Sequence, residues 1–240
     1  MKRLDEYEQH FLRSPKVVAE LIGHSTIRKN DIVYDLGAGS GIISSVLARR
    51  CRQVFAVEIE PKTIELLRQN TKESENIAII KSDIMKLPVP DGSYKIFANP
   101  PFSLSSNIIE RFLFSNNPPK ATYLVVQRQF ARKLMLEANH FTSQLGMSLG
   151  PIFSTRIRKP LRKTDFFPHP AVDTVLLEIK RREEPLLPAS QLSNYYEYIN
   201  YYFTHPPEFY ARIGKQIKPS SLKLSEWLKL FVADAGDRHE

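Results

Sequence analysis

Along residues 32–135, short runs rich in β-branched and apolar residues alternate with stretches of helical periodicity, and this alternation is the strongest constraint on the fold. It predicts a parallel β-sheet with helices on both of its faces. The expected strands are Ile32–Asp35, Val54–Glu58, Ala78–Lys81, Ile96–Ala98 and Tyr123–Val126. The expected helices are Ile42–Arg50, Pro61–Gln69, Asn107–Phe114 and Gln129–Met135.

The pattern changes near residue 150. Gly150–Arg158 and Thr174–Lys180 have strand character with no obvious helix between them, and we expect an antiparallel pair at the sheet edge. Beyond the charged, proline-containing segment Arg181–Pro188, apolar residues recur at helical spacing. We therefore predict an α/β domain over residues 1–182 and a small helical domain over residues 183–240. The helical stripes are Tyr195, Tyr198, Ile199 and Tyr202, then Leu224, Trp227, Leu228 and Phe231.

Composition limits the classes of function. The chain has 34 Lys and Arg residues against 26 Asp and Glu residues, and its net charge of +8 favours a polyanionic partner, although a basic soluble surface would carry the same charge. The single Cys51 excludes an intrachain disulfide, and residues 1–10 lack an apolar signal segment, so we expect a cytoplasmic protein. No apolar run approaches the roughly 20 residues that span a bilayer.

A glycine-rich turn, Asp35–Gly41, lies between the first expected strand and its helix. Glycines let the backbone turn tightly and approach a ligand, and cofactors commonly bind at this turn of a nucleotide-binding sheet. Glu58 ends the second expected strand, where it can accept from ribose hydroxyls. Asp83 follows the third strand, where it can accept from an adenine amino group.

The turn also limits the kind of cofactor. The dinucleotide fingerprint G-x-G-x-x-G fails because Ile42 stands at its third glycine position, and no Gly-Lys-Ser/Thr phosphate loop is present. These absences indicate a cofactor without phosphates, which fits S-adenosylmethionine. A glycine turn without a ligand is the alternative, and the two acids at the strand ends argue against it.

The tetrad Asn99-Pro100-Pro101-Phe102 follows the fourth expected strand. An adenine N6 amine is a poor nucleophile because its lone pair is delocalised into the ring. The Asn99 side-chain oxygen and the Pro100 carbonyl can accept from both N–H groups and free that lone pair, while the prolines stiffen the loop. Phe102 can stack on the base and tolerates nearby cationic charge. The tetrad therefore indicates methylation of an amino group.

Two basic clusters follow these motifs in the sequence, and we expect them to flank the mouth of the active site. We expect them to contact RNA phosphates, although a solvated charged face is the usual explanation for a single cluster. The clusters are Arg128, Arg132 and Lys133, then Arg156, Arg158, Lys159, Arg162 and Lys163.

Over nearly its whole length, the chain resembles the Erm-type 23S ribosomal RNA adenine N6-methyltransferases. The segment Gln9-His10-Phe11-Leu12 is similar to the family's cofactor segment, with His10 where Asn is usual. Asp35–Gly41, Glu58, Asp83 and the tetrad follow in the family's order, with Pro100 where Ile or Leu is usual. The string from Phe166 to Leu177 resembles the signature Phe-x-Pro-x-Pro-x-Val-x-Ser-Val-Leu and is the most specific match.

The resemblance implies a Rossmann-like S-adenosylmethionine-dependent methyltransferase domain with a small helical C-terminal domain. It implies that Phe166 helps to hold a base flipped out of structured RNA. It also implies methylation of an adenine in the drug-binding region of 23S rRNA, with resistance to macrolides, lincosamides and streptogramin B. The cofactor-binding residues it implies are His10, Leu12, Gly37, Gly39, Glu58, Ile59, Asp83, Ile84 and Asn99.

Three alternatives remain open at this point. The chain could be a 16S rRNA adenine dimethyltransferase, an RNA-binding assembly factor that has lost catalysis, or a DNA adenine methyltransferase. The intact Asn99 and Phe102 argue against lost catalysis. The string from Phe166 to Leu177, which we call the Phe-Phe-Pro signature, is unexplained in a DNA enzyme. We expect a monomer whose partner is ribosomal RNA, with no membrane association.

Overall fold

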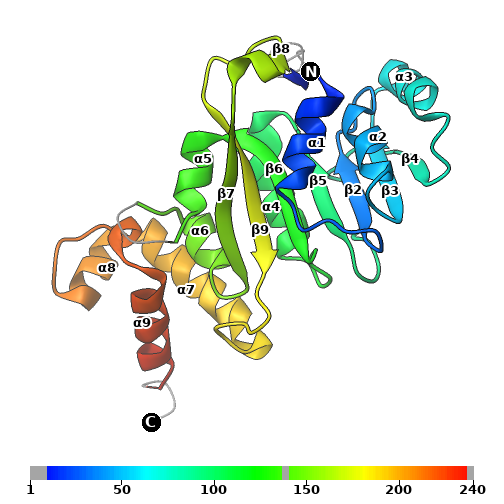
Figure 1. Ribbon diagram of the computed structural model, residues 1–240. Coiled ribbons are helices and arrows are strands. Elements are labelled where there is room, and N and C mark those ends of the chain that lie inside the picture. The colour runs from blue at the N-terminus through cyan, green and yellow to red at the C-terminus, as the bar shows by residue number, and fades with distance from the viewer. Residues whose placement is uncertain (1–9, 137–140, 237–240) are drawn as a thin grey trace. The chain divides into compact units, whose positions relative to one another are not determined.

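The computed structural model describes residues 10–136 and 141–236 (Figure 1). It divides into two compact units. The sheet unit comprises Met1–Arg128 and Arg156–Lys180, and the helical unit comprises Gln129–Thr155 and Arg181–Glu240. Gln9, expected to open the cofactor segment, lies outside the described residues.

A seven-stranded sheet with the order β4-β3-β2-β5-β6-β9-β7 organises the fold. The strands from β4 to β6 are parallel, as predicted, and β9 pairs antiparallel with β6. The two late strands are neighbours at one edge, where the sequence places them. The strands are β2 (Ile32–Leu36), β3 (Gln53–Glu58), β4 (Ile77–Lys81), β5 (Lys95–Ala98), β6 (Ala121–Gln127), β7 (Phe153–Leu161) and β9 (Thr174–Arg181).

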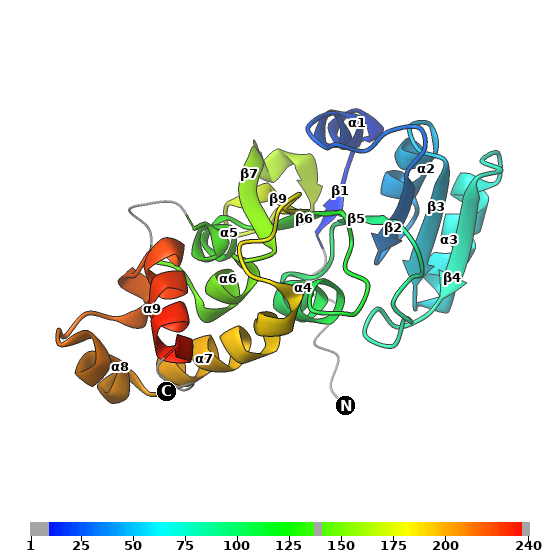
Figure 2. The same ribbon diagram turned by 90° about the horizontal axis from the view of Figure 1, so that it is seen from below.

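Helices cover both faces of the parallel part of the sheet. Helices α1 (Pro15–Gly23), α2 (Ile42–Ala48) and α3 (Pro61–Thr71) follow one another in contact, and Figure 2 shows α1 and α4 (Ser105–Leu113) on opposite faces. Ser14 caps α1 by accepting a hydrogen bond from the backbone N–H of Lys16 at 3.2 Å. The buried stripe of α1 packs against the sheet through Val18, Leu21 and Ile22.

A second, two-stranded sheet joins the start of the described chain to the Phe-Phe-Pro signature. Strand β1 (Phe11–Leu12) pairs antiparallel with β8 (Phe166–Phe167). Because side chains alternate across a strand, Leu12 and Phe166 enter the core while Phe11 and Phe167 face outward. The 3₁₀ helices are η1 (Phe102–Leu104), η2 (Lys163–Asp165), η3 (Ala189–Gln191) and η4 (Pro219–Ser221).

The helical unit is built around Trp227, which is fully buried. The predicted tyrosine stripe faces this core, with the Tyr195 ring edge-on to Phe231. Met147 and Leu136 pack in the same core, and Gln129–Thr155 therefore groups with the C-terminal helices. From the sequence we expected this segment in the first domain, over residues 1–182. The helices are α5 (Arg128–Leu134), α6 (Gln144–Leu149), α7 (Leu192–Thr204), α8 (Pro206–Ile213) and α9 (Leu224–Gly236).

Among the described residues, no helix is both long enough and apolar enough to cross a membrane.

A buried polar network stabilises the centre of the sheet unit. The Tyr123 hydroxyl donates its one proton to Glu178 Oε2 at 3.0 Å. The Tyr123 oxygen therefore accepts its other two hydrogen bonds, from the Thr26 N–H at 2.8 Å and from the Thr26 hydroxyl at 2.9 Å. Burial raises the pKa of Tyr123 to about 12, which keeps the hydroxyl protonated and able to donate.

We expect Tyr123→Phe to lower the free energy of unfolding by about 1–3 kcal/mol, because it removes partners from buried donors and acceptors. Urea denaturation measures the change. Tyr34→Phe is the matched control, because the Tyr34 hydroxyl makes no hydrogen bond with a described residue. Equal losses in the two variants would contradict a role for the network.

Candidate active site

The order of the strands reverses between β2 and β5, which are neighbours in the sheet although β3 and β4 lie between them in the sequence. In open α/β sheets, ligands bind outside the carboxyl ends of the strands at such a switch point. The glycine-rich turn follows β2 and the Asn-Pro-Pro-Phe tetrad follows β5, so the fold brings both predicted motifs to this point.

The glycine-rich turn needs its glycines. Gly37, Gly39 and Gly41 have φ values of 76°, 55° and 90°, a region that other residues rarely adopt. A Cβ at Gly37 would lie 3.7 Å from Ile84 Cδ1, and one at Gly39 would lie 3.6 Å from the Phe11 ring. Ile84 and Phe11 therefore border the turn.

The two acids at the ends of β3 and β4 accept hydrogen bonds from the backbone at this edge of the sheet. Glu58 accepts the Gly39 N–H at 2.9 Å through Oε2, and the Ile59 and Glu60 N–H groups at 2.8 and 3.0 Å through Oε1. Asp83 accepts the Met85 N–H at 2.8 Å through Oδ1, whereas its Oδ2 has no partner among the described residues. Glu58 thus fixes the turn, and Asp83 keeps an acceptor available.

Asp35, which lies on β2 at the start of the glycine-rich turn, is fully buried. Its Oδ2 accepts from the Ser44 hydroxyl at 2.6 Å, and its Oδ1 has no partner within the described chain. Burial raises the pKa of Asp35 to about 7; the Ser44 hydrogen bond opposes the rise and the charge of Glu58 adds to it. Asp35 belongs to the predicted turn, and no separate role was expected for it from the sequence.

A single hydrogen bond orients the Asn99 amide. Its Nδ2 donates to the His10 backbone carbonyl at 2.7 Å. Because a carbonyl only accepts, the amide nitrogen faces His10 and Oδ1 points away from it. Neither Asn99 Oδ1 nor the Pro100 carbonyl accepts a hydrogen bond from a described residue. Two unpaired acceptors therefore stand at consecutive positions.

His10 also contacts the aromatic part of the site. Its Nδ1 lies 2.9 Å from the Pro168 carbonyl, which can only accept, so Nδ1 carries a proton. Its ring centroid lies 5.5 Å from that of Phe102, which is half-buried. His10 thus links the tetrad to the Phe-Phe-Pro signature.

Two residues that we expected to contact the base or the cofactor have almost no exposed side-chain surface. Phe166 is 0% exposed and Leu12 is 4% exposed, because both point into the core from the paired strands β1 and β8. Direct stacking of Phe166 on a base is not supported in this conformation. The exposed aromatic side chains of this small sheet are Phe167 at 67% and Phe11 at 48%, which the sequence analysis does not propose.

The site fits a cationic cofactor that carries hydroxyl and amino groups. Asp35 has an orphaned buried oxygen, Asp83 has an open one, and Glu58 uses three of its roughly four lone-pair sites. Ile84 lies against the turn and Ile59 is 57% exposed, which provides apolar contact area. In the part of the chain that the structure describes, no group of His, Cys, Asp and Glu residues forms a metal site.

The raised pKa of Asp35 has a consequence for stability. The folded protein binds this proton more tightly than the unfolded chain, so the contribution of Asp35 to stability is present at low pH and is lost as the pH rises from about 4 to about 7. We expect Asp35→Asn, which resembles the protonated carboxyl, to flatten this part of the profile and to be more stable than wild type at pH 8. Urea unfolding at pH 5 and pH 8 without cofactor tests this, with the exposed Asp91→Asn as control. Parallel profiles for wild type and Asp35→Asn would contradict it.

Comparisons with known proteins identify the family of the chain. The model of the ribosomal RNA adenine dimethylase family matches residues 2–206. An rRNA adenine N-6-methyltransferase of Limosilactobacillus reuteri is 31% identical over 174 residues, which cover 72% of this chain and 69% of that protein. A ribosomal RNA small subunit methyltransferase A of Streptococcus thermophilus is 25% identical over 191 residues, which cover 75% and 66%.

Two solved structures share the fold over almost the whole chain. The 23S rRNA methyltransferase ErmE has a TM-score of 0.79 at 24% identity and covers 92% of this chain and 98% of its own. A dimethyladenosine transferase from Plasmodium falciparum has a TM-score of 0.77 at 17% identity and covers 95% and 98%. The Rossmann-like methyltransferase fold predicted from the sequence is confirmed, and the chain belongs to the ribosomal RNA adenine dimethylase family of S-adenosylmethionine-dependent methyltransferases.

Proposed function

We propose that this protein methylates N6 of an adenine in 23S ribosomal RNA and thereby confers resistance to macrolides, lincosamides and streptogramin B. The observation that carries the chemistry is the Asn99 amide, which His10 holds so that its oxygen is unpaired next to the Pro100 carbonyl. The choice of 23S RNA rests on the resemblance of the motifs between Gln9 and Leu177 to those of the Erm-type enzymes.

Asn99 and Pro100 provide the acceptors for the two N6–H groups of the adenine. Hydrogen bonds to both groups hold the amine in place and draw its nitrogen toward tetrahedral geometry, so that its lone pair becomes available for attack. The acceptors are held before the substrate arrives, because the His10 hydrogen bond and the ring of the buried Pro100 restrict them. Bound S-adenosylmethionine supplies the methyl group.

Phe102 provides a face for the base. The ring is half-buried and packs against His10, which limits its freedom before the base binds. An aromatic face also stabilises the positive charge that develops on N6. The methylated amine is a strongly acidic ammonium while it still carries the extra proton, so it loses that proton without a general base.

Residues at the ends of β2, β3 and β4 would hold the cofactor. Gly37 and Gly39 would allow the backbone to approach it, Glu58 and Asp83 would accept from its hydroxyl and amino groups, and Ile59 and Ile84 would line its pocket. His10 borders it from β1, and Leu12 places His10 by anchoring that strand in the core. Asp35 adds an unpaired, buried carboxyl oxygen at the start of the turn.

We expect Asn99→Ala to reduce methyl transfer by at least about a hundredfold, the usual loss when one preorganised polar group of an active site is removed. Cofactor affinity should remain measurable, because the glycine-rich turn and the strand-end acids are unchanged. The exposed Asn107→Ala on α4 is the control and should keep full activity. Full activity of Asn99→Ala would contradict the mechanism.

The target is tested by incubating the protein with labelled S-adenosylmethionine and, separately, 23S rRNA, 16S rRNA and DNA stripped of methylation. Primer extension then locates the modified base. A block at an adenine of the drug-binding region of 23S rRNA is the expected result. Label on 16S rRNA or DNA would refute the proposed target while keeping the chemistry, and cofactor binding with no label anywhere would refute the enzymatic proposal.

A further inference from the structure

The cations expected to contact RNA are largely engaged within the chain. Arg128 lies 3.6 Å from Asp173, whereas Arg132 and Lys133 of the same cluster have no side-chain partner among the described residues. In the second cluster only Arg156 lacks an acceptor among the described residues. An RNA phosphate at the other four would have to compete with contacts already made. These contacts are Arg158 with Glu178, Lys159 with Glu20, Arg162 with Asp165, and Lys163 with the Ala171 carbonyl.

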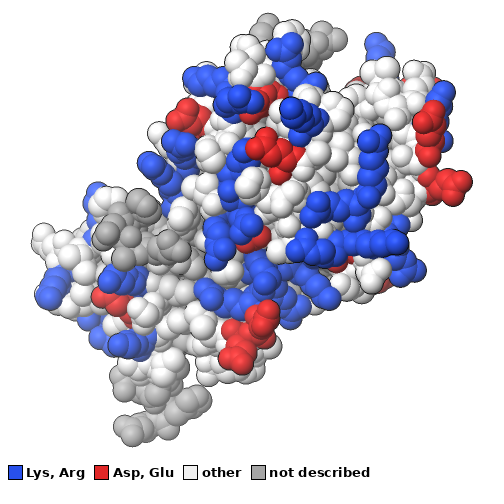
Figure 3. Space-filling view, viewed as in Figure 1, with Lys and Arg blue, Asp and Glu red and all other residues white. Residues whose placement is uncertain are grey.

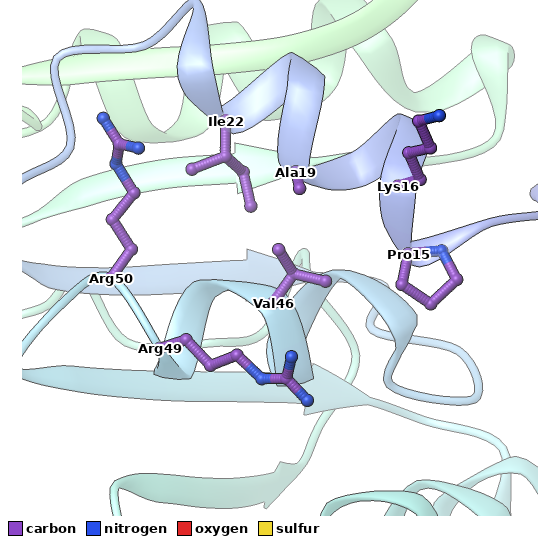
Figure 4. A pocket seen from close by; sticks show the side chains of 7 residues that line it. All are labelled: Pro15, Lys16, Ala19, Ile22, Val46, Arg49 and Arg50. Carbon is purple, nitrogen blue, oxygen red and sulfur yellow. The ribbon is translucent and has the colours of Figure 1, made fainter.

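A different basic site lies between α1 and α2. It is a cavity of about 470 Å³ lined by both helices and the residues that follow α2 (Figure 4). Ile22 and Val46 point toward one another across it, and its exposed apolar side chains are Pro15 and Ala19. The remaining lining residues are Lys16, Arg49 and Arg50, and no acid lines the cavity. We call these seven residues the α1–α2 groove.

The three cations are available to a ligand. Lys16 and Arg49 are exposed and make no ion pair or hydrogen bond through their side chains with any described residue. Arg50 donates from Nε to the Ile27 carbonyl at 3.2 Å, which fixes its direction and leaves its terminal nitrogens open. The charged groups surround the groove rather than meet at one point, which suits a chain of phosphates better than one small anion (Figure 4).

Helix electrostatics do not explain all of this arrangement. Arg49 and Arg50 follow the carboxyl end of α2, where cations stabilise a helix. Lys16 stands in the first turn of α1, where the helix end is already partly positive and a cation is unfavourable. An anionic ligand in the groove would offset this cost.

The groove starts at the edge of the sheet that carries the active site. Helix α1 follows β1, whose neighbour His10 holds Asn99, and α2 follows the glycine-rich turn. Lys16 is therefore near the active-site edge, and Arg50 lies beyond the other end of α2. Figure 3 shows that Lys and Arg side chains predominate on the face of the sheet unit that carries these helices.

We propose that the α1–α2 groove binds the phosphodiester backbone of the RNA substrate. The bound segment runs from the target adenine along α1 and α2. This inference rests on the proposed function and adds to it a contact surface outside the base pocket. Phosphates pair with Lys16, Arg49 and Arg50, and the sugars lie against Pro15, Ala19 and Val46. Each phosphate contact releases counterions, so the groove contributes to the salt dependence of RNA affinity.

The test compares Lys16→Glu/Arg49→Glu with Lys62→Glu/Lys72→Glu in the full-length protein. The control pair changes net charge equally at exposed positions of α3 or just after it, outside the groove. Anisotropy titrations with a 23S rRNA fragment at several salt concentrations give affinity and salt slope. We expect the groove variant to bind at least tenfold more weakly than the control, with a log–log slope smaller in magnitude than that of wild type by roughly 2.

A milder pair, Lys16→Gln/Arg49→Gln, guards against misfolding and should show the same direction of change, with S-adenosylhomocysteine binding unchanged in all variants. Equal affinity and slope in the groove and control variants would overturn the groove proposal alone, since wild type would still bind and methylate RNA. A wild-type protein that binds the cofactor and no RNA would refute both this inference and the proposed function.

Discussion

The hydrogen bond from Asn99 Nδ2 to the His10 carbonyl is the constraint on which the proposed chemistry depends. It selects one of the two orientations of the amide, and only that orientation presents an acceptor beside the Pro100 carbonyl. The bond exists because β1 pairs with β8, which anchors Leu12 in the core and leaves His10 at the tetrad. A short peripheral sheet therefore sets the geometry of a site that belongs to the main sheet.

Opposite charges are separated within the sheet unit. Asp35, Glu58 and Asp83 gather below and beside the glycine-rich turn, where a cationic cofactor gains from them, and the desolvation of Asp35 raises its pKa to about 7. Lys16, Arg49 and Arg50 line the groove between α1 and α2, where they face solvent. One unit thus combines a cluster of acids at the glycine-rich turn with a groove lined by three cations.

The main sheet, its helices and the two motif loops could be predicted from the sequence because their signals are local. Periodicity locates each strand within a few residues, and the carboxyl ends of parallel strands necessarily meet at one edge. The pairing of β1 with β8 has no such signal, since each strand has two residues and the partners are distant in the chain. The burial of Phe166 and the exposure of Phe167 follow from that pairing. The grouping of Gln129–Thr155 with the C-terminal helices follows from a different tertiary contact, the packing of Met147 in the core of the helical unit.

A crystal structure of the protein with S-adenosylhomocysteine and adenosine tests the central claim most directly. The account predicts adenosine N6 within hydrogen-bonding distance of both Asn99 Oδ1 and the Pro100 carbonyl, with the Asn99 amide nitrogen still on the His10 carbonyl and the base against Phe102. Adenosine bound with N6 away from these two acceptors, or an Asn99 amide turned to face N6 with its nitrogen, would contradict it.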